Sequence, residues 1–452
     1  MVIGPFQQVP IGDGATADLY LLRYDDNGRL RSPLTEIQLK KSLGGVSDVF
    51  LFSHGWNNVF ATALERYRDF IAGYWRQRQQ YCLPVSPGYR PLLVGVIWPS
   101  TDFVLPWEMG PKIAAAPGPG GFEAGQTEQL LSFVTESLDP DADAAFTELV
   151  DGRIALDADE ARQAAEIVLA ALRPGADPDD GSPPPSADEF LDTWSAVDGG
   201  ETPVPADPDD FGTYADAPLA QRPTVAGISL DPRNLLRLAS VWQMKARAGQ
   251  VGVTGVGPLV RHVLEQSDAR LHLIGHSFGA RLVLSALAAQ VPAREAHSML
   301  LLEPAVNRWC FAGDVGGTGR KGGYNPVLSR VRNPILSTFS AYDAPLTKVF
   351  QLAMRGGNLG EPNIAALGDP ELYGALGGFG PAGLGGRSTT EPAAIPGKEG
   401  YDLSAGYEVI AIDGSTKIDG KPAISGHSDI SNPATWWALH CLTRPDRWLK
   451  SA

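Results

Sequence analysis

Cysteine is scarce in this chain of 452 residues. Only three cysteines occur, Cys82, Cys310 and Cys441, and they lie far apart in the sequence. A disulfide framework is typical of short chains rich in cysteine, and a structural zinc site needs ligands at close spacing. We therefore expect no disulfide framework, and we expect the three thiols to lie in the core.

The chain also lacks an excess of positive charge. Its net charge is −15, which argues against nucleic-acid binding. The negative charge is concentrated in residues 136–210, where 21 acidic residues are accompanied by only three arginines. We interpret this acidic segment as a solvated surface and not as a recognition site for charged partners.

Long apolar runs are absent as well. None reaches the length that a membrane-spanning helix needs, and residues 1–6 lack the charged and apolar regions of a secretory signal. We expect a soluble, cytoplasmic protein with no transmembrane segment. Apolar residues nevertheless make up 43% of the chain, which is enough for a large core.

No pattern of metal or phosphate ligands is present. His272 and His276 have the spacing of a helical metal site, but they lie in an apolar run that predicts a strand, where four residues span about 13 Å. Lys321 follows a glycine-rich stretch without the residue order of a phosphate-binding loop. The sequence therefore predicts no metal site and no cofactor.

The order of the apolar segments predicts an α/β protein. Short apolar runs alternate with stretches at helical spacing, as in a mostly parallel sheet that helices cover on both faces. A turn rich in Asp, Asn and Gly also predicts a β-hairpin within residues 17–31. The expected strands cover residues 46–53, 91–100, 271–275, 298–304, 334–342 and 407–412, and the expected helices cover residues 61–79, 159–173, 234–248, 257–266, 281–289 and 433–449.

This alternation is interrupted between residues 101 and 232. The segment holds loops rich in proline and glycine around helical stretches, and we expect it to be partly flexible near residues 175–187. We interpret it as an insertion between two strands of one sheet. The predicted organisation is a first part of the core at residues 1–100, an acidic, partly helical insertion resembling a lid or cap at 101–232, and a second part of the core at 233–452.

One motif stands out at the end of the expected central strand. The sequence Gly-His-Ser-Phe-Gly at residues 275–279 follows an apolar run and precedes a helical stretch. In this context a serine between two glycines is typical of a nucleophile elbow, because the sharp turn exposes the hydroxyl group. Ser277 is therefore the candidate nucleophile. It needs a base, an acid that orients the base, and donors for an oxyanion.

Three histidines follow Ser277 in the chain. His297 precedes a strand, at what should be the wrong end of the sheet, and His440 lies in an apolar helical stretch that indicates a core position. His427 lies in a loop just after the last expected strand, where its ring can reach the ends of the strands. We favour His427 as the base.

The candidate acid is Asp343, at the carboxyl end of the strand before the last. Ligand chemistry gathers at that end of a parallel sheet. Asp343 could also cap the helix that Pro345 would open. Glu303, at the end of the preceding strand, and Asp429, beside His427 in the sequence, are alternatives, and we favour Asp343 over both.

Two backbone N–H groups are candidate oxyanion donors. One belongs to Phe278, directly after Ser277, and the other to Trp56, in the loop after the strand at residues 46–53. Gly55 gives that loop the freedom to turn its N–H groups toward the site. The side chain of His54 is expected to brace the loop and not to transfer protons.

Taken together, these segments resemble the α/β-hydrolase superfamily, specifically its lipase- and esterase-type serine hydrolases. The combination of His-Gly-Trp-Asn at residues 54–57 with Trp-Pro-Ser at residues 98–100 also resembles a group of bacterial hydrolases. The resemblance covers roughly residues 19–100 and 234–449, and it does not cover the acidic insertion. The matching segments are His-Gly-Trp-Asn at residues 54–57, Trp-Pro-Ser at 98–100, the motif at 275–279, Asp343 and His427, in the superfamily's order of Ser, Asp and His.

The resemblance implies an α/β-hydrolase fold and hydrolysis of a small-molecule or lipid carboxylic ester through an acyl-enzyme, without a cofactor. Ser277 would attack the carbonyl, His427 would move the proton, Asp343 would orient His427, and the Trp56 and Phe278 amides would hold the oxyanion. Two alternatives stay open. The same site could transfer the acyl group to an alcohol or amine, or the fold could serve as an inactive binding module. The sequence does not define an oligomeric state.

Overall fold

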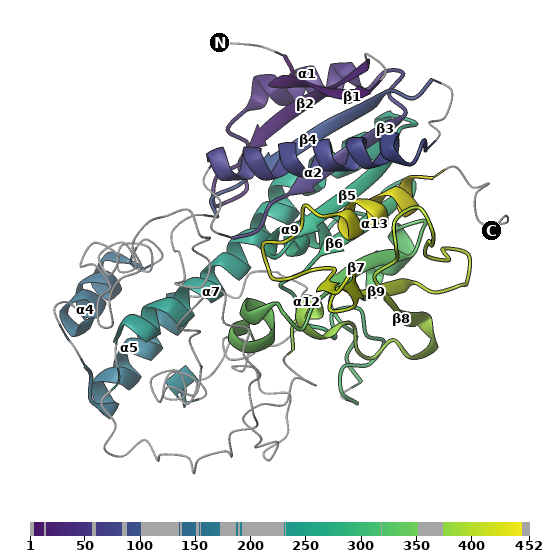
Figure 1. Cartoon of the computed structure of the whole chain (residues 1–452). Coiled ribbons are helices and arrows are strands. Elements are labelled where there is room, and N and C mark those ends of the chain that lie inside the picture. Colours follow the sequence, from purple (N-terminus) through teal and green to yellow (C-terminus); the bar gives the residue numbers. More distant parts are fainter. Residues whose placement is uncertain are drawn as a thin grey trace.

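A mostly parallel sheet of nine strands forms the centre of the protein (Figure 1). This computed structural model describes residues 4–12, 15–56, 60–83, 88–100, 135, 138–150, 153, 155–171, 187–188, 190–191, 230, 232–317, 319–350 and 374–444. The strand order is β1-β2-β4-β3-β5-β6-β7-β9-β8, and every neighbouring pair is parallel except β1 and β2. The expected α/β class is therefore confirmed. The strands are β1 (Gln7–Gly12), β2 (Ala15–Arg23), β3 (Asp48–Ser53), β4 (Pro91–Ile97), β5 (Arg270–His276), β6 (Ser298–Leu302), β7 (Ile335–Phe339), β8 (Ser388–Pro392) and β9 (Val409–Asp413).

Helices cover both faces of this sheet. In Figure 1, α2 and α13 lie over one face, and α9 lies behind the other. Because successive side chains of a strand point to opposite faces, β3 places Val49 and Leu51 in one core cluster and Phe50 and Phe52 in the other. Burial on both faces explains the continuous apolar runs of the central strands. The helices are α1 (Pro33–Ser42), α2 (Phe60–Gln80), α4 (Pro140–Val150), α5 (Ala158–Ala171), α7 (Pro232–Gln250), α8 (Gly257–Gln266), α9 (Phe278–Ala288), α12 (Leu376–Phe379) and α13 (Pro433–Thr443).

The predicted hairpin within residues 17–31 is formed only in part. β2 pairs antiparallel with β1, which precedes it in the chain. After β2 the chain turns back at the Asp-Asn-Gly sequence, where an isolated antiparallel bridge joins Tyr24 and Leu30 and the N–H of Arg31 donates to the carbonyl of Arg23. Leu30 stands between two arginines and is partly buried against the core, and a single apolar residue is too little for a second strand.

The two strands at the ends of the sheet, β1 and β8, are absent from the sequence prediction. Each contains a proline, Pro10 in β1 and Pro392 in β8, and each has only one strand neighbour. Edge strands tolerate proline and carry few buried side chains, so they give only a weak apolar pattern.

The expectation that all three thiols lie in the core is wrong for Cys82, which is exposed. Cys82 follows the end of α2 and has a positive φ of 48°, so it belongs to the turn by which the chain leaves the helix. Cys310 and Cys441 are buried, and none of the three forms a disulfide.

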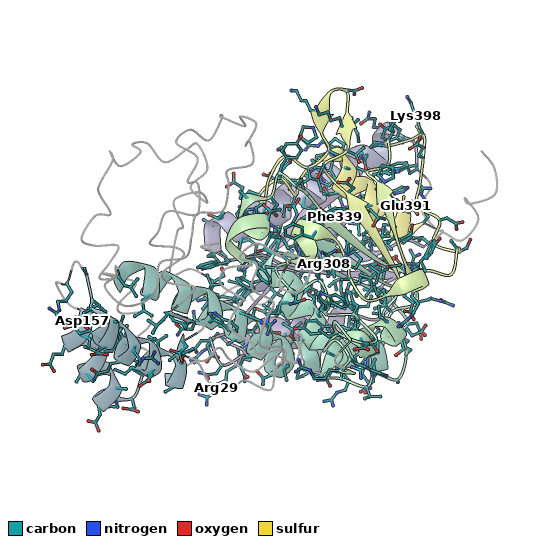
Figure 2. All side chains as sticks on the ribbon, turned by 90° about the horizontal axis from the view of Figure 1, so that it is seen from below. Arg29, Asp157, Arg308, Phe339, Glu391 and Lys398 are labelled. Atoms are coloured by element: carbon teal, nitrogen blue, oxygen red, sulfur yellow. The ribbon has the colours of Figure 1, made fainter. Side chains whose placement is uncertain are left out.

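Residues 98–269 connect β4 to β5, although β3 lies between these two strands in the sheet. Much of the predicted insertion at residues 101–232, including nearly all of the stretch at 175–187 expected to be flexible, lies outside the described residues. Within it, α4 packs on α5, and α5 contacts α7 (Figure 1). Asp157, just before α5, lies on the opposite side of the molecule from Glu391 and Lys398 (Figure 2). The predicted domain boundaries stay a prediction.

Within the described ranges, no helix has the length and the apolar composition needed to cross a bilayer. The longest two, α2 with 21 residues and α7 with 19, both carry several charged side chains.

Candidate active site

The site begins at the junction of β5 and α9. Ser277 stands between them with φ 55° and ψ −126°, a conformation that is strained for a residue with a side chain. The flanking glycines permit this turn, because a Cβ on Gly275 would lie 2.4 Å from the Cα of Ala280, and one on Gly279 would lie 2.2 Å from the carbonyl oxygen of Ser53. The motif therefore forms the sharp strand–turn–helix connection that the sequence predicts.

Backbone hydrogen bonds from the neighbouring strand hold Ser277 in this conformation. Its N–H donates to the carbonyl of Leu302 at 3.0 Å, and its carbonyl accepts from the N–H of Ala305 at 3.2 Å. Both partners lie at the end of β6 or just beyond it. The position of the serine hydroxyl is consequently fixed by the sheet and not by a mobile loop.

His427 and Asp343 complete a hydrogen-bonded chain that begins at Ser277. The Nε2 of His427 lies 2.8 Å from the Oγ of Ser277, and its Nδ1 lies 2.7 Å from Oδ2 of Asp343. Because the carboxylate accepts, Nδ1 carries the hydrogen and Nε2 is left to accept from the serine hydroxyl. Such a chain can remove the proton of the serine during an attack on an electrophile.

Asp343 serves two partners with its two carboxylate oxygens. Oδ2 binds His427, and Oδ1 accepts the N–H of Leu346 at 3.0 Å, in the helical turn that follows. The side chain is fully buried. The two interpretations of Asp343 in the sequence, as an acid for the site and as a helix cap, therefore describe the same side chain.

Asp429, one of the two alternative acids, points away from His427. Its Oδ2 accepts from the N–H and the hydroxyl of Ser425, and its Oδ1 lies 3.2 Å from the side-chain amide of Asn432. It braces the loop that carries His427.

Glu303, the other alternative acid, is fully buried and has a positive φ of 45°. Among the residues that the structure describes, neither of its carboxyl oxygens has a hydrogen-bond partner. Burial, and next the negative charges of Asp343 and Asp429, raise the pKa of Glu303 well above its ordinary value. Burial without a hydrogen-bond partner therefore favours the neutral form of this carboxyl group.

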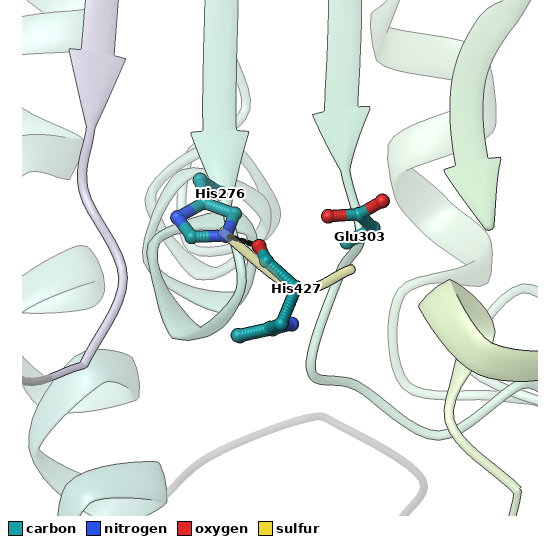
Figure 3. A group of neighbouring side chains, drawn as sticks. All are labelled: His276, Glu303 and His427. Carbon is teal, nitrogen blue, oxygen red and sulfur yellow. Dashed lines mark hydrogen bonds between the residues drawn. The ribbon is translucent and has the colours of Figure 1, made fainter. Parts of the chain in front are cut away.

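His276, the last residue of β5, holds the backbone of His427. Its Nε2–H donates to the carbonyl oxygen of His427 at 2.8 Å, as the dashed line in Figure 3 marks. Burial, and next the charge of His427, lower the pKa of His276 well below its ordinary value, so the ring is neutral. In the sequence, His276 stands out only as a possible metal ligand, and no local pattern reveals a contact with a residue 151 positions away.

His276, Glu303 and His427 together have the side-chain types of a metal site, with one possible ligand atom from each within 4.8 Å of the others. Both ring nitrogens of His427 are already used for Ser277 and Asp343. The Nε2 of His276 carries a hydrogen toward a carbonyl. These residues therefore fit a hydrogen-bonded network better than a metal site.

The loop after β3 packs directly against Ser277. A Cβ on Gly55 would lie 2.7 Å from the Cβ of Ser277, which brings this loop beside the serine. Next to it, the ring of Trp56 lies 6.1 Å from that of Phe278. Both predicted oxyanion residues thus flank Ser277.

His54 has the structural role expected of it. Its ring stacks on Trp98, with centroids 5.6 Å apart, and its Nδ1 lies 2.8 Å from the carbonyl of Gly55. Burial lowers the pKa of His54 to about 4. The neutral ring braces the loop from behind.

A second chain of serine, histidine and aspartate lies at the amino-terminal end of the sheet. The Nδ1 of His272 is 2.7 Å from the hydroxyl of Ser298, and its Nε2 is 2.9 Å from Asp48, which also pairs with Arg270. Asp48, His272 and Ser298 are at most 1% exposed, and Ser277 is itself only 3% exposed, so it is their place in the sheet that separates the two serines. This second chain ties β3, β5 and β6 together.

The two other candidate histidines lie away from Ser277. His440 is buried in α13 against Trp437, as the sequence predicts. His297 packs edge-on against His272 at the amino-terminal end of the sheet.

Comparisons of the chain with models of protein families, with curated proteins and with solved structures find no match. Inferences about its function therefore depend on the geometry of the site.

Proposed function

We propose that the chain has the α/β-hydrolase fold and is a serine hydrolase that cleaves carboxylic esters through an acyl-enzyme. The observation that carries this proposal is the continuous hydrogen-bonded chain from Ser277 through His427 to Asp343. It lies at the carboxyl ends of the parallel strands, where ligand chemistry gathers in open sheets. The left-handed backbone of Ser277 is the second support, since strain of this kind clusters at reactive sites.

In the proposed reaction, Ser277 Oγ attacks the ester carbonyl carbon while His427 Nε2 takes the hydroxyl proton. Asp343 holds the other nitrogen of the ring and stabilises the imidazolium that forms. His427 then gives the proton to the departing alcohol. A water molecule, deprotonated in turn by His427, hydrolyses the acyl-enzyme and regenerates the serine.

The oxyanion of each tetrahedral intermediate needs preorganised donors. The N–H of Phe278 belongs to the first turn of α9, where backbone N–H groups have no acceptor within the helix. We assign two donors to the oxyanion, the N–H of Phe278 and the N–H of Trp56. Trp56 belongs to the loop that packs against Ser277 at Gly55.

The test is hydrolysis of p-nitrophenyl esters from acetate to palmitate by the wild type, Ser277→Ala and Ser298→Ala. Ser298 is the matched control, because it also bonds to a histidine that an aspartate holds, but it lies at the opposite, amino-terminal end of the sheet. We expect Ser277→Ala to lose all enzymatic turnover and Ser298→Ala to retain it. Equal turnover in the wild type and Ser277→Ala would refute the proposal.

A serine-reactive phosphonate separates a hydrolase with a narrow substrate range from an inactive binding module. A hydrolase should be labelled at Ser277 even when none of the test esters is a substrate. Absence of labelling would favour the binding module.

A further inference from the structure

The most unusual side chain beside the proposed triad is that of Glu303. It follows β6 and lies between Leu302, whose carbonyl accepts the N–H of Ser277, and Ala305, whose N–H donates to the carbonyl of Ser277. Figure 3 shows Glu303 and His276 at the ends of neighbouring strands, with His427 beside them. The left-handed φ of Glu303 is unfavourable for a glutamate, and the fold nevertheless keeps this residue at the centre of the site.

The carboxyl group of Glu303 makes no hydrogen bond with any residue of the described ranges, although it is fully buried. Burying a polar group without a partner is costly, and an ionised carboxylate would be far more costly than a neutral acid. The negative charge of Asp343 adds to this cost. Burial is the larger cause of the raised pKa of Glu303, and the charge of Asp343 is the next.

One oxygen of this carboxyl group lies within 4.8 Å of a ring nitrogen of His427. A hydrogen bond needs a separation of about 2.8 Å, so the Glu303 oxygen has to move by up to about 2 Å to reach the ring. A rotation of the Glu303 side chain provides a displacement of this size. Asp343 now occupies the acceptor position at Nδ1. Removal of the Asp343 carboxylate would open space at this position and would take away one of the two negative charges that add to burial in raising the pKa of Glu303.

We infer that Glu303 is a reserve acid of the site, a positioning residue that takes over the hydrogen bond from His427 Nδ1 when the carboxylate of Asp343 is missing. This inference rests on the proposed function, because it assigns Glu303 to the orientation of the same base. In that state Glu303 loses its proton to solvent, and its carboxylate accepts the Nδ1–H of His427.

A double-mutant cycle tests this role with Asp343→Ala, Glu303→Gln and the double variant. Alanine opens the space beside His427, whereas asparagine would fill it. Glutamine keeps the volume of Glu303 but cannot carry a negative charge. Glu391→Gln in the Asp343→Ala background is the matched control, since Glu391 lies on the edge strand β8, far along the sheet order from β5.

We expect Asp343→Ala to retain measurable turnover and the double variant to lose about tenfold or more beyond it in kcat, with KM little changed. Glu303→Gln should cost less in the wild-type background than in Asp343→Ala. The control substitution should add no loss. Equal kcat in Asp343→Ala and in a folded double variant would overturn the inference.

Proton NMR supplies a readout that does not depend on turnover. A histidine N–H bonded to a carboxylate resonates at unusually low field, and we expect such a signal in Asp343→Ala and its loss in the double variant. A wild type that neither hydrolyses esters nor reacts with phosphonate would refute the proposed function. The low-field signal would still decide whether Glu303 binds His427, and its absence from Asp343→Ala would overturn the inference by itself.

Discussion

The ring of His276 donates a hydrogen bond of 2.8 Å from Nε2 to the backbone carbonyl of His427. The donor is the last residue of the buried strand β5, and the acceptor lies in a loop after the small hairpin of β10 (Lys417–Ile418) and β11 (Lys421–Pro422). The strand that leads into Ser277 therefore also fixes the backbone of His427. A rigid element positions both ends of the proposed proton transfer.

Replacing His276 with phenylalanine should lower kcat about fivefold with little change in KM. The ring volume is kept, but the donor to the His427 carbonyl is lost, and a hydrogen bond of this kind contributes about 1 kcal/mol. His276→Gln, whose amide can donate, should retain more activity. Steady-state kinetics of the two variants and of His262→Phe, on α8, provide the comparison. A kcat of His276→Phe equal to that of the wild type would contradict this role.

Asp343→Asn should reduce kcat by about 10⁴, the loss seen for the equivalent change in a serine protease. Asparagine keeps an oxygen for the N–H of Leu346 but can direct an N–H₂ group at the Nδ1–H of His427, which favours the wrong tautomer. The free energy of unfolding should therefore change much less than the activity. A large loss of stability with normal kcat per folded molecule would show that Asp343 acts only as a helix cap.

The sequence predicts the features that depend on local patterns. The continuous apolar runs of β3, β4 and β5 gave the α/β class, because only strands buried on both faces need them. The glycines around Ser277 gave the sharp turn. Asp343 and His427 could be selected because parallel strands bring their carboxyl ends to one edge, and the structure does bring both to Ser277.

Features that depend on distant contacts could not be predicted in this way. The strand β8 contributes no fully buried side chain, so its sequence carries no strand pattern. The burial of Glu303 and the contact from His276 to His427 arise only when β5, β6 and the His427 loop are assembled. One signal was overlooked: Asp419 and Gly420 both have positive φ and form the Asp-Gly turn of the hairpin between β10 and β11.

Asp48→Ala should destabilise the fold without a specific effect on the proposed chemistry. Asp48 is buried and accepts from His272 and Arg270, so its removal takes the acceptor from the Nε2 of His272 and from one guanidinium nitrogen of Arg270, at a cost of about 3–5 kcal/mol. Urea unfolding measures the loss, and titration with phosphonate gives kcat per folded molecule. If kcat per labelled site fell as it does in Asp343→Asn, the second chain would be coupled to the reaction.

Gly279→Ala should abolish the folded site, whereas Gly386→Ala should be nearly neutral. A Cβ on Gly279 would lie 2.2 Å from the carbonyl oxygen of Ser53 and 2.4 Å from that of His54, so the loop after β3 would have to move. A Cβ on Gly386 would meet no atom within 4 Å. We expect Gly279→Ala to lose about 3 kcal/mol or more of unfolding free energy. Unfolding curves that coincide for the two variants would refute the close packing of loop and helix.

Stability should fall as the pH drops below about 6.5, and His440 should be one cause. Burial, and next the charges of Arg444 and Arg78, lower the pKa of His440 to about 2, whereas in the unfolded chain it is about 6.5. Between about pH 2 and about pH 6.5, His440 is therefore protonated in the unfolded state but not in the folded state. The stabilisation is complete above pH 6.5 and is lost as the pH falls, by up to about 1.4 kcal/mol per pH unit for one histidine. Urea unfolding at several pH values should show that the unfolding free energy of His440→Phe falls less steeply than that of the wild type between about pH 6 and pH 4. If the unfolding free energy of both proteins changed with pH in the same way, His440 would be protonated in the folded state as well.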